Sequence, residues 1–391
     1  MSERLVCPAC GSSSLTPIYK LSGIPVQSCI LLDDETSARQ FPRHDLVLYF
    51  CEDCGLVFNA VFERARVAYE DTTEESQHFS GTFNGFAKQL VREIAGMRDW
   101  RGSETVEIGC GKGDFLRELV DATGLQGLGI DPGFLPDRFA GGAAQAIRFE
   151  REYFDPRHVE MRPDLIVCRH TLEHIDEVGR FMDDVAALVD ERKPVTVFFE
   201  TPDVARVLAE GAFWDIYYEH CSYFTMGSHA RALRRAGFNV THSRLAYDGQ
   251  YIIQYAVPGE SETTLEEERD MDVLRGLAAG FPAKVAEIRG YWTDFVQSRH
   301  AAGKRVAIWG GGSKGVSFLT TNDVAESVSQ VVDINPHKQG KYLPVTAHQV
   351  IGPQALTEAP PDTVIVMNPI YLPEIGRSLA DLGLSPELVA V

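Results

Sequence analysis

One short segment, residues 105–113 with the sequence TVEIGCGKG, constrains the fold more than any other part of the chain. An apolar run that fits a buried strand leads directly into a turn with three glycines. Residues 114–122 follow with apolar side chains at helical spacing, and residues 127–131 form a second expected strand that ends in an acid. Strand, glycine turn, helix, strand and carboxylate is the order of a Rossmann-like unit, in which a ligand lies against the glycine backbone and a carboxylate binds a ribose diol. The sequence therefore predicts an α/β fold with a nucleotide-type ligand.

A second unit of this kind lies near the carboxyl end, where residues 304–315 read KRVAIWGGGSKG. Gly310, Gly312 and Gly315 form G-x-G-x-x-G, and Asp333 lies 21 residues past Gly312. Three interpretations stay open at this point. The turn binds NAD, which implies an oxidoreductase; it binds the diphosphate of a substrate through the helix N-terminus and Lys314; or it is a scaffold that closes a cleft.

The amino-terminal region carries two C-x-x-C pairs, each followed by glycine. Four thiolates at this spacing complete a tetrahedral zinc site and leave no position for chemistry, so we expect a structural zinc ion. A redox C-x-x-C is the alternative. The expected metal ligands are Cys7, Cys10, Cys51 and Cys54.

Composition and charge exclude several classes of protein. The chain has 391 residues, which predicts two to three domains, and 44% of its residues are hydrophobic, enough for a substantial core. Its net charge of −19 argues against nucleic acid as the main partner. The apolar runs are too short to cross a membrane, and the first residues lack the apolar stretch of a secretory signal, so we expect a cytoplasmic location.

Two details distinguish the first glycine turn from an NAD site. Glu107 lies inside the preceding strand and gives E-x-G-x-G-x-G, and residues 164–175, DLIVCRHTLEHI, fit a fourth strand that leads into a helix. Over residues 105–255 this pattern resembles class I methyltransferases that depend on S-adenosylmethionine (SAM). The resemblance implies that Asp131 holds the ribose and that Tyr153 and Phe154 flank the adenine, unless these two aromatic residues are ordinary core. The full set of expected cofactor contacts is Glu107, Gly109, Gly111, Gly113, Asp131, Tyr153, Phe154 and His170.

His170, Glu173 and His174 also spell H-x-x-E-H, the spacing of an inverted zinc-protease motif. The segment directly follows a buried strand of a nucleotide-binding fold, where methyltransferases place pocket residues, and this disfavours the protease. His174 is then a wall or proton-handling residue of the cleft, or a histidine that only caps or packs.

Residues 213–225, FWDIYYEHCSYFT, combine aromatic and titratable side chains in one short loop. A histidine beside a carboxylate and near a phenol can abstract a proton: the imidazole accepts it, the carboxylate orients or charges the imidazole, and the phenol donates to an enolate oxygen. The predicted catalytic residues are therefore Tyr217, Glu219 and His220, with His174. The alternative is an aromatic-rich turn that closes the sheet.

Together, the four-cysteine region, the SAM fold and Y-x-E-H resemble the sugar C-methyltransferases that act on nucleotide-linked keto-deoxysugars of antibiotic pathways. The resemblance implies removal of a proton next to a ketone, followed by attack of the enolate carbon on the SAM methyl group. It also implies a carboxy-terminal Rossmann-like domain without NAD, and hence a zinc domain at 1–70, a SAM domain at 71–258 and a substrate domain at 259–391. The expected substrate contacts are His78, Tyr218, Tyr223, Gly312, Lys314 and Asn335.

The chain departs from this family between residues 68 and 86. Tyr69 is present, but the later active-site tyrosine has no clear counterpart, and His78 and Phe79 occupy its neighbourhood. The acceptor is accordingly open, and a non-sugar natural product or methylation of oxygen is the alternative. A non-enzymatic binding module fits neither the charge nor the Y-x-E-H loop. We expect a small-molecule partner and a monomer or weak homodimer.

Overall fold

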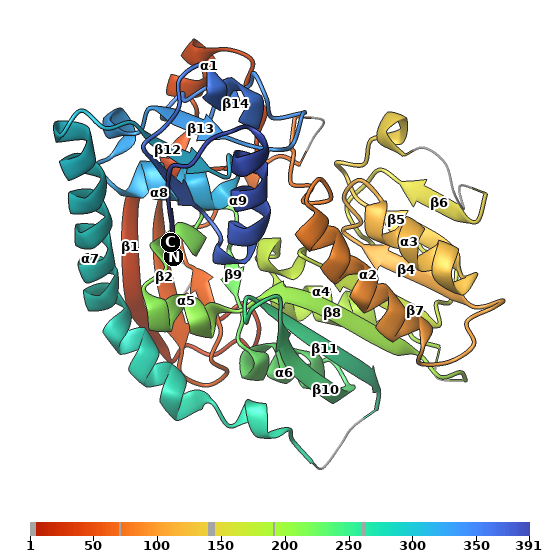
Figure 1. Ribbon diagram of the computed structural model, residues 1–391. Coiled ribbons are helices and arrows are strands. Elements are labelled where there is room, and N and C mark those ends of the chain that lie inside the picture. Colours follow the sequence, from red (N-terminus) through yellow and green to blue (C-terminus); the bar gives the residue numbers. More distant parts are fainter. Residues whose placement is uncertain (1–4, 70–71, 140–144, 191, 260–262) are drawn as a thin grey trace.

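The computed structural model describes residues 5–69, 72–139, 145–190, 192–259 and 263–391. Within these ranges the chain forms three sheets, and helices flank the two larger ones (Figure 1). The helices are α1 (Glu35–Arg39), α2 (Gly81–Ala95), α3 (Asp114–Thr123), α4 (Val178–Ala186), α5 (Val204–Glu210), α6 (Met226–Arg235), α7 (Met271–Ala301), α8 (Ser313–Thr321) and α9 (Leu372–Asp381). Short 3₁₀ turns lie at Arg64–Arg66, Pro136–Arg138, Leu172–His174, Phe213–Asp215, Glu266–Glu268, Ala325–Ser327, Pro353–Thr357 and Pro369–Tyr371.

The first sheet is antiparallel and follows the cysteine-rich segment. Its order is β1 (Leu15–Pro25), β2 (Arg43–Cys51), β3 (Val57–Asn59) and β9 (Ser222–Tyr223). The last strand comes from the loop in which we predicted the catalytic residues, because Val57 pairs with Tyr223 and Phe58 with Ser222. The amino-terminal sheet therefore anchors that loop directly.

The central sheet has the order β10-β11-β8-β7-β4-β5-β6. Its strands are β4 (Glu104–Ile108), β5 (Gln126–Ile130), β6 (Ile147–Glu150), β7 (Leu165–Arg169), β8 (Thr196–Pro202), β10 (Phe238–Ala246) and β11 (Tyr251–Pro258). Side chains alternate across a strand, so Leu165 and Val167 of β7 pack with α2 and α3 on one face, while Ile166 and Cys168 pack with α4 and α6 on the other. The predicted Rossmann-like domain is confirmed.

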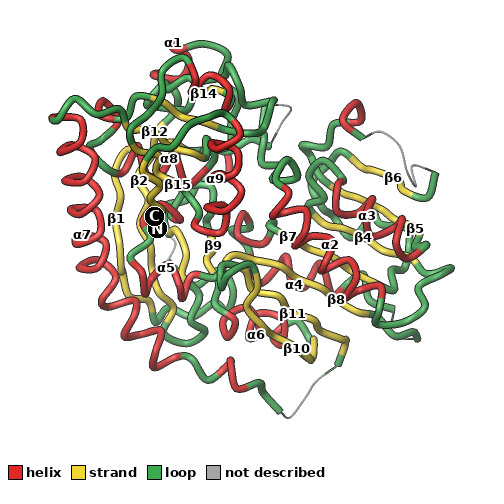
Figure 2. The backbone as a smooth tube through the Cα atoms, viewed as in Figure 1, coloured by secondary structure: helices red, strands yellow, loops and turns green. Residues whose placement is uncertain are grey.

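The third sheet is wholly parallel, with the order β14-β13-β12-β15-β16. Its strands are β12 (Val306–Trp309), β13 (Gln330–Val332), β14 (Val350–Ile351), β15 (Thr363–Val366) and β16 (Glu387–Ala390). It confirms a second Rossmann-like unit. The long helix α7 leads into this unit and runs beside β1 of the first sheet (Figure 2).

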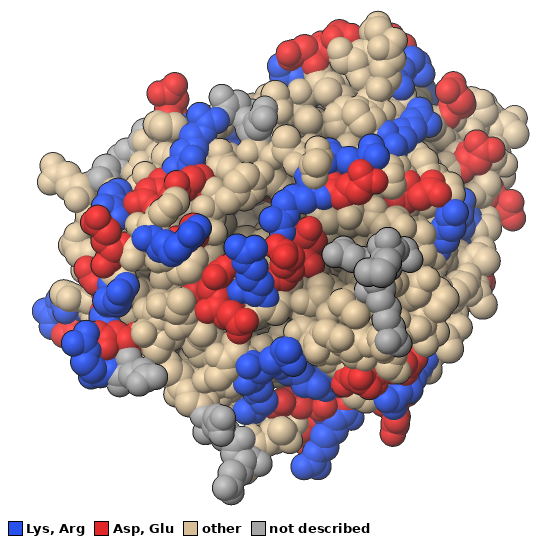
Figure 3. Space-filling view, turned by 180° about the vertical axis from the view of Figure 1, so that it is seen from behind, with Lys and Arg blue, Asp and Glu red and all other residues tan. Residues whose placement is uncertain are grey.

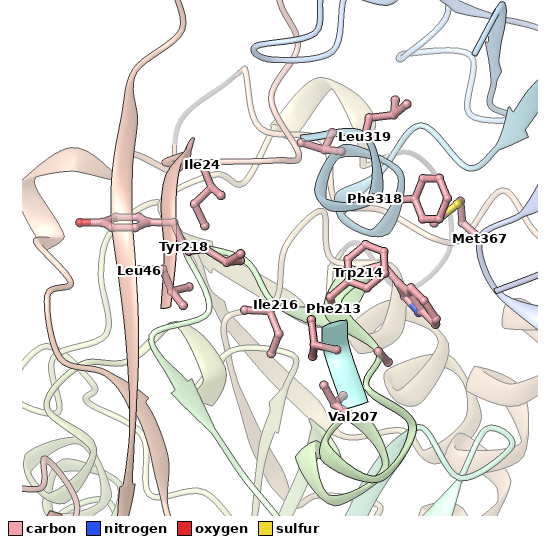
Figure 4. Close-up of a cluster of buried hydrophobic side chains, with 14 of the residues drawn as sticks. Ile24, Leu46, Val207, Phe213, Trp214, Ile216, Tyr218, Phe318, Leu319 and Met367 are labelled. Atoms are coloured by element: carbon pink, nitrogen blue, oxygen red, sulfur yellow. The ribbon is translucent and has the colours of Figure 1, made fainter. Parts of the chain in front are cut away.

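The amino-terminal sheet and the carboxy-terminal unit share one hydrophobic core. Figure 4 shows Ile24 and Leu46 of the first sheet near Ile216 of the central loop and Phe318 of α8. The first and last parts of the chain also meet in backbone bridges, since Leu32 pairs with Tyr342. The sequence did not predict this shared core, which holds both ends of the chain around the central loop.

In both Rossmann-like units, the direction in which the chain adds strands to the sheet reverses once. In the central sheet the chain moves from β4 to β5 and β6 and then returns to β7 on the other side of β4. The third sheet repeats this pattern at β12, with β13 and β14 on one side and β15 and β16 on the other. Ligands of open α/β sheets bind at the carboxyl ends of the strands at such a switch point. The topology therefore places two potential ligand sites in one molecule.

Acidic and basic side chains alternate over the face shown in Figure 3. In the described parts of the chain, no helix has both the length and the apolar character needed to cross a bilayer.

Candidate active site

One cavity of about 980 Å³ connects both switch points. Gly109 and His170 line it from the central sheet, Gly310 and Asn368 line it from the third sheet, and His220 lines it from the central loop. Pockets for small ligands measure about 300–1,000 Å³, so this cavity lies at the upper end of that range. The cavity therefore has room for a large ligand, and it extends past both glycine turns.

The glycine turn after β4 has a backbone that only glycine adopts without strain. The φ angles of Gly109, Gly111 and Gly113 are 71°, 53° and 81°. A Cβ atom on Gly109 would lie 1.9 Å from Oγ1 of Thr171, so a side chain has no room there. The turn thus forms a narrow cradle of backbone at the start of α3, as the motif predicts.

Two carboxyl groups stand beside this cradle. Asp131 accepts hydrogen bonds from the backbone amides of Gly111 at 2.9 Å and Gly133 at 2.7 Å, which hold it at the end of β5. Glu107 is almost fully buried, and its Oε2 has no hydrogen-bond partner among the described residues. Burial raises the pKa of Glu107 to about 8. The glycine cradle lies beside the buried carboxyl group of Glu107, whose Oε2 has no partner among the described residues. This arrangement fits a ligand that brings hydroxyl groups and positive charge, as SAM does.

The other predicted cofactor contacts lie around the same end of the cavity. Tyr153 is largely exposed at the rim, and the ring of Phe154 packs 5.9 Å from that of Phe181. His170 lies between two carboxylates, with Nε2 2.9 Å from Glu200 and Nδ1 3.5 Å from Glu173. Although burial opposes the charged form, these carboxylates raise the pKa of His170 to about 9. His170 is therefore a charged residue of the cavity wall. This first histidine of H-x-x-E-H lies closer to the carboxylate of Glu200 than to that of Glu173 within the motif.

His220 stands where the rings of the central loop converge. Its ring centre lies 4.7 Å from that of His174, 4.5 Å from that of Tyr217 and 6.1 Å from that of Tyr223. Within the described residues its ring nitrogens have no hydrogen-bond partner. Burial lowers the pKa of His220 well below its ordinary value, and the positive charges of neighbouring histidines and Lys314 add to this effect. The imidazole is neutral and faces the cavity with its lone pair available.

His174 is held by two oxygen atoms. Its Nδ1 lies 3.0 Å from the backbone carbonyl of Glu219 and 2.6 Å from the hydroxyl of Tyr69. A carbonyl only accepts, so the imidazole proton belongs on Nδ1 and points to both oxygens. The hydroxyl hydrogen of Tyr69 is then free to point elsewhere. Tyr69 is a site residue that the sequence analysis named but did not assign, because its position in the loop carried no motif.

The carboxylate of Glu219 does not orient His220, contrary to our expectation. Its Oε1 accepts hydrogen bonds from the backbone amide, at 2.8 Å, and the hydroxyl of Ser28. Ser28 follows β1, so this contact ties the central loop to the amino-terminal region. Burial raises the pKa of Glu219, and Oε2 has no partner among the described residues.

Tyr217 donates a hydrogen bond of 2.9 Å to Oδ1 of Asp215. Asp215 is also bound by the ammonium group of Lys314, at 2.8 Å, and by the guanidinium group of Arg206. Lys314 further donates to Gln250 at 3.3 Å. The prediction that Lys314 is free to bind a substrate anion is therefore not what the geometry shows, because its charge is already paired inside the protein. It instead links α8 of the carboxy-terminal unit to the loop that carries Tyr217.

The remaining predicted substrate contacts divide into two groups. Tyr218 points away from the cavity: it is fully buried beside Phe62, and its hydroxyl accepts from the backbone amide of Glu63. It therefore points in another direction than Tyr217, although the two residues are adjacent in the loop. The other residues line the cavity, namely His78, Tyr223, Gly312 and Asn335.

Three of these residues are already engaged within the protein. His78 bonds to Asn84 at 3.0 Å, the hydroxyl of Tyr223 donates to the carbonyl of Tyr217 at 2.9 Å, and the amide of Asn335 donates to Glu74 at 2.9 Å. Such contacts fix the shape of the cavity wall.

The four predicted metal ligands lie together at one end of the amino-terminal sheet. Sγ of Cys7 lies 3.5 Å from Sγ of Cys54, Sγ of Cys10 lies 3.6 Å from Sγ of Cys51, and all four sulfur atoms fall within 4.8 Å of one another. Zn–S bonds of about 2.3 Å in a tetrahedron place the sulfur atoms about 3.8 Å apart. The cluster fits a four-thiolate zinc ion.

Comparison with known proteins adds to this geometry. Residues 82–243 match the family described as "Methyltransferase domain", and residues 255–383 match the family described as "C-methyltransferase C-terminal domain". "C-methyltransferase NovU" of Streptomyces niveus is 26% identical over 396 residues, which cover 94% of this chain and 90% of NovU. The second match includes the glycine turn at Gly310–Gly315. The sequence analysis left this turn open as an NAD site, a site for a substrate diphosphate or a scaffold.

Two solved structures with a similar fold each match less than half of this chain. An S-adenosylmethionine dependent methyltransferase from Mesorhizobium loti is 18% identical with a TM-score of 0.35, covering 44% of this chain and 99% of that one. The 1,6-didemethyltoxoflavin-N1-methyltransferase of Burkholderia thailandensis is 16% identical with a TM-score of 0.35, covering 46% and 79%. The two family matches show that the chain carries a methyltransferase domain followed by a C-methyltransferase C-terminal domain, and therefore that it is a methyltransferase.

Proposed function

We propose that this enzyme methylates a carbon atom next to the ketone of a nucleotide-linked deoxysugar, by removing a proton and letting the enolate carbon accept the methyl group. The observation that carries the proposal is the position of His220. Its neutral imidazole, which has no hydrogen-bond partner among the described residues, faces the same cavity as the glycine turn and Asp131. The C-methyltransferase C-terminal domain and the likeness to NovU support carbon as the acceptor.

The cofactor end of the cavity is the cradle of Gly109, Gly111 and Gly113. When bound, SAM would supply an electrophilic methyl group. Asp131 is placed to accept hydrogen bonds from its ribose, and Glu107 to face its methionine part. Because both carboxyl groups are held or buried before the ligand arrives, the site needs little rearrangement to bind.

The acceptor end of the cavity is formed by His220, His174 and Tyr69. His220 accepts the proton from the carbon next to the ketone. The hydroxyl of Tyr69 donates to the ketone oxygen, where negative charge develops, because its own oxygen already receives the proton of His174. We assign this role to Tyr69 rather than to Tyr217, which we first expected, because the hydroxyl of Tyr217 donates to Asp215.

The third part of the site comes from the carboxy-terminal unit. Lys314 neutralises Asp215, which in turn holds the phenol of Tyr217 beside His220. The nucleotide part of the acceptor then lies toward the second switch point, near Gly312 and Asn335. We propose this unit as the substrate domain and the four-cysteine region as the site of a structural zinc ion.

Asp131→Ala is expected to weaken SAM binding about 10- to 100-fold, because hydrogen bonds to a charged group contribute about 1.5–3 kcal/mol. Isothermal titration calorimetry with SAM measures the change. Asp137→Ala is the matched control, since Asp137 is an exposed acid on the same loop. Equal affinities of the two variants would contradict the assignment of Asp131.

Tyr69→Phe is expected to lower kcat about 10²–10³-fold with little change in KM, because one donor to a developing oxyanion is worth about that much. Steady-state kinetics with the keto-deoxysugar nucleotide gives both constants. Tyr19→Phe serves as the control, since Tyr19 packs against Phe281 in the core shared with α7. A rise in KM alone would place Tyr69 in substrate binding instead.

The proposed reaction is tested with an acceptor that carries deuterium next to the ketone. C-methylation replaces one of these labels, so mass spectrometry shows a product with one added methyl group and one label lost. O-methylation, or methylation of a non-sugar compound, is the alternative of the same architecture. A methylated product that keeps every label, under conditions where the unreacted acceptor keeps its label too, would overturn the proposal.

A further inference from the structure

A cluster of three side chains in the cavity has the composition of a second metal site. Glu173 and His174 lie on the 3₁₀ turn Leu172–His174, and His220 comes from the central loop. One ligand atom from each lies within 4.8 Å of the others. The cluster is separate from the four cysteines, and the proposed methyl transfer requires no metal ion at this position.

Glu173 is the member whose environment points to a missing ligand. The residue is 2% exposed. Oε1 faces Nδ1 of His170 at 3.5 Å, whereas Oε2 has no hydrogen-bond partner among the described residues. A buried carboxylate oxygen without a donor is unfavourable, and native proteins generally satisfy such groups. A bound cation would satisfy this one.

The two histidines present suitable nitrogen atoms. The carbonyl of Glu219 and the hydroxyl of Tyr69 hold the proton of His174 on Nδ1, which leaves the lone pair on Nε2. A metal-binding histidine almost always donates its other nitrogen to an oxygen in this way. His220 has no hydrogen-bond partner in the described parts of the chain, so its one available lone pair is not committed either.

We propose that Glu173, His174 and His220 bind a divalent transition-metal ion in the acceptor end of the cavity. Two imidazoles and one carboxylate favour ions such as Zn²⁺ and Co²⁺ over Mg²⁺ and Ca²⁺, which prefer oxygen ligands. Bonds of about 2.1 Å in a tetrahedron require ligand atoms about 3.4 Å apart, so the side chains close by about 1 Å on binding. The fourth position faces the cavity.

Occupation of this site excludes the proposed chemistry. An ion bound to His220 takes the lone pair with which the imidazole accepts a proton. The ion therefore inhibits methyl transfer, and it competes with the acceptor for the same space. This inhibition rests on the proposed role of His220, whereas binding of the ion does not.

Cobalt gives a readout that needs no turnover. The probe is Co²⁺, added to full-length protein whose four-cysteine site is already loaded with zinc. Co²⁺ in a nitrogen and oxygen site absorbs in the visible range, and Co²⁺ bound to thiolates also absorbs in the near ultraviolet. We expect a visible band that saturates at one added Co²⁺ per chain without the thiolate band.

Glu173→Gln is expected to weaken this Co²⁺ binding at least 10-fold, and His220→Ala is expected to do the same. Glu177→Gln is the matched control, because Glu177 is an exposed acid nearby that pairs with Arg64. SAM titration of each variant confirms that it is folded. Absence of the visible band in the wild type at millimolar Co²⁺, or equal affinity in the folded Glu173→Gln variant, would overturn the proposal.

Inhibition is measured separately, with the acceptor and SAM. Added Co²⁺ is expected to inhibit the wild type, and removal of the excess ion by a mild chelator is expected to restore activity. Cobalt binding without inhibition would confirm the site and contradict the role of His220 as the base. The spectrum and the kinetics thus separate failure of the metal site from failure of the proposed function.

Discussion

His220→Ala is expected to reduce kcat about 10²–10⁴-fold, the range in which a positioned general base contributes to catalysis. His220 is neutral and without a partner in the described structure, so its removal deletes the proton acceptor and leaves little else to rearrange. The glycine turn and Asp131 belong to other elements of the cavity. SAM affinity should therefore stay nearly unchanged.

Steady-state kinetics and calorimetry with SAM measure the two effects on the same preparation. His158→Ala is the control, because His158 is an exposed histidine that pairs with Glu152 outside the cavity lining. A large loss of SAM affinity in His220→Ala would assign His220 to positioning of the cofactor. Unchanged turnover would remove it from the mechanism.

Cys51→Ser is expected to abolish zinc binding at the proposed four-cysteine site and to unfold the amino-terminal region. Zinc binding by four thiolates contributes about 10–16 kcal/mol in small domains, which is comparable with the whole stability of a typical protein, about 5–15 kcal/mol. Cys51 is fully buried at the end of β2, and the turn around Cys7 bonds to α4 through Gly179 and Pro8. Loss of the ion therefore also loosens the contact between the amino-terminal region and the central domain.

Metal analysis by mass spectrometry and a thermal unfolding curve test this expectation. Cys29→Ser is the matched control, since Cys29 lies outside the cluster and bonds to Ser313. The control should keep one zinc ion per chain and the wild-type Tm. Full zinc content and an unchanged Tm in Cys51→Ser would show that the cluster is not a metal site that stabilises the fold.

Much of the fold follows from local patterns. The glycine turns at Gly109 and Gly310, each between an apolar strand and a helix, predicted two Rossmann-like units, and both are present. These patterns are reliable because positive φ angles and close backbone contacts demand glycine at particular positions. The paired cysteines were equally informative, since two C-x-x-C turns allow few arrangements of their sulfur atoms.

Side-chain directions in the loop were harder to predict. Tyr217 and Tyr218 are adjacent, yet one lines the cavity and the other is buried against Phe62. Glu219 accepts a hydrogen bond from Ser28 rather than from His220. Lys314 forms an ion pair with Asp215, so its charge is not free for a substrate anion. These contacts join residues that are far apart in the chain. The different directions of the two adjacent tyrosines depend instead on the path of the loop.

The sequence by itself determined the class of the protein and its local building units: glycine turns, cysteine pairs and a loop rich in titratable side chains. Only the tertiary structure decided which of these groups meet. Tyr69, His174 and His220 converge because β9 joins the amino-terminal sheet and because one core holds both ends of the chain around the central loop. The physical reason is that backbone conformation depends on neighbours in sequence, whereas a site depends on long-range packing, which no short motif encodes.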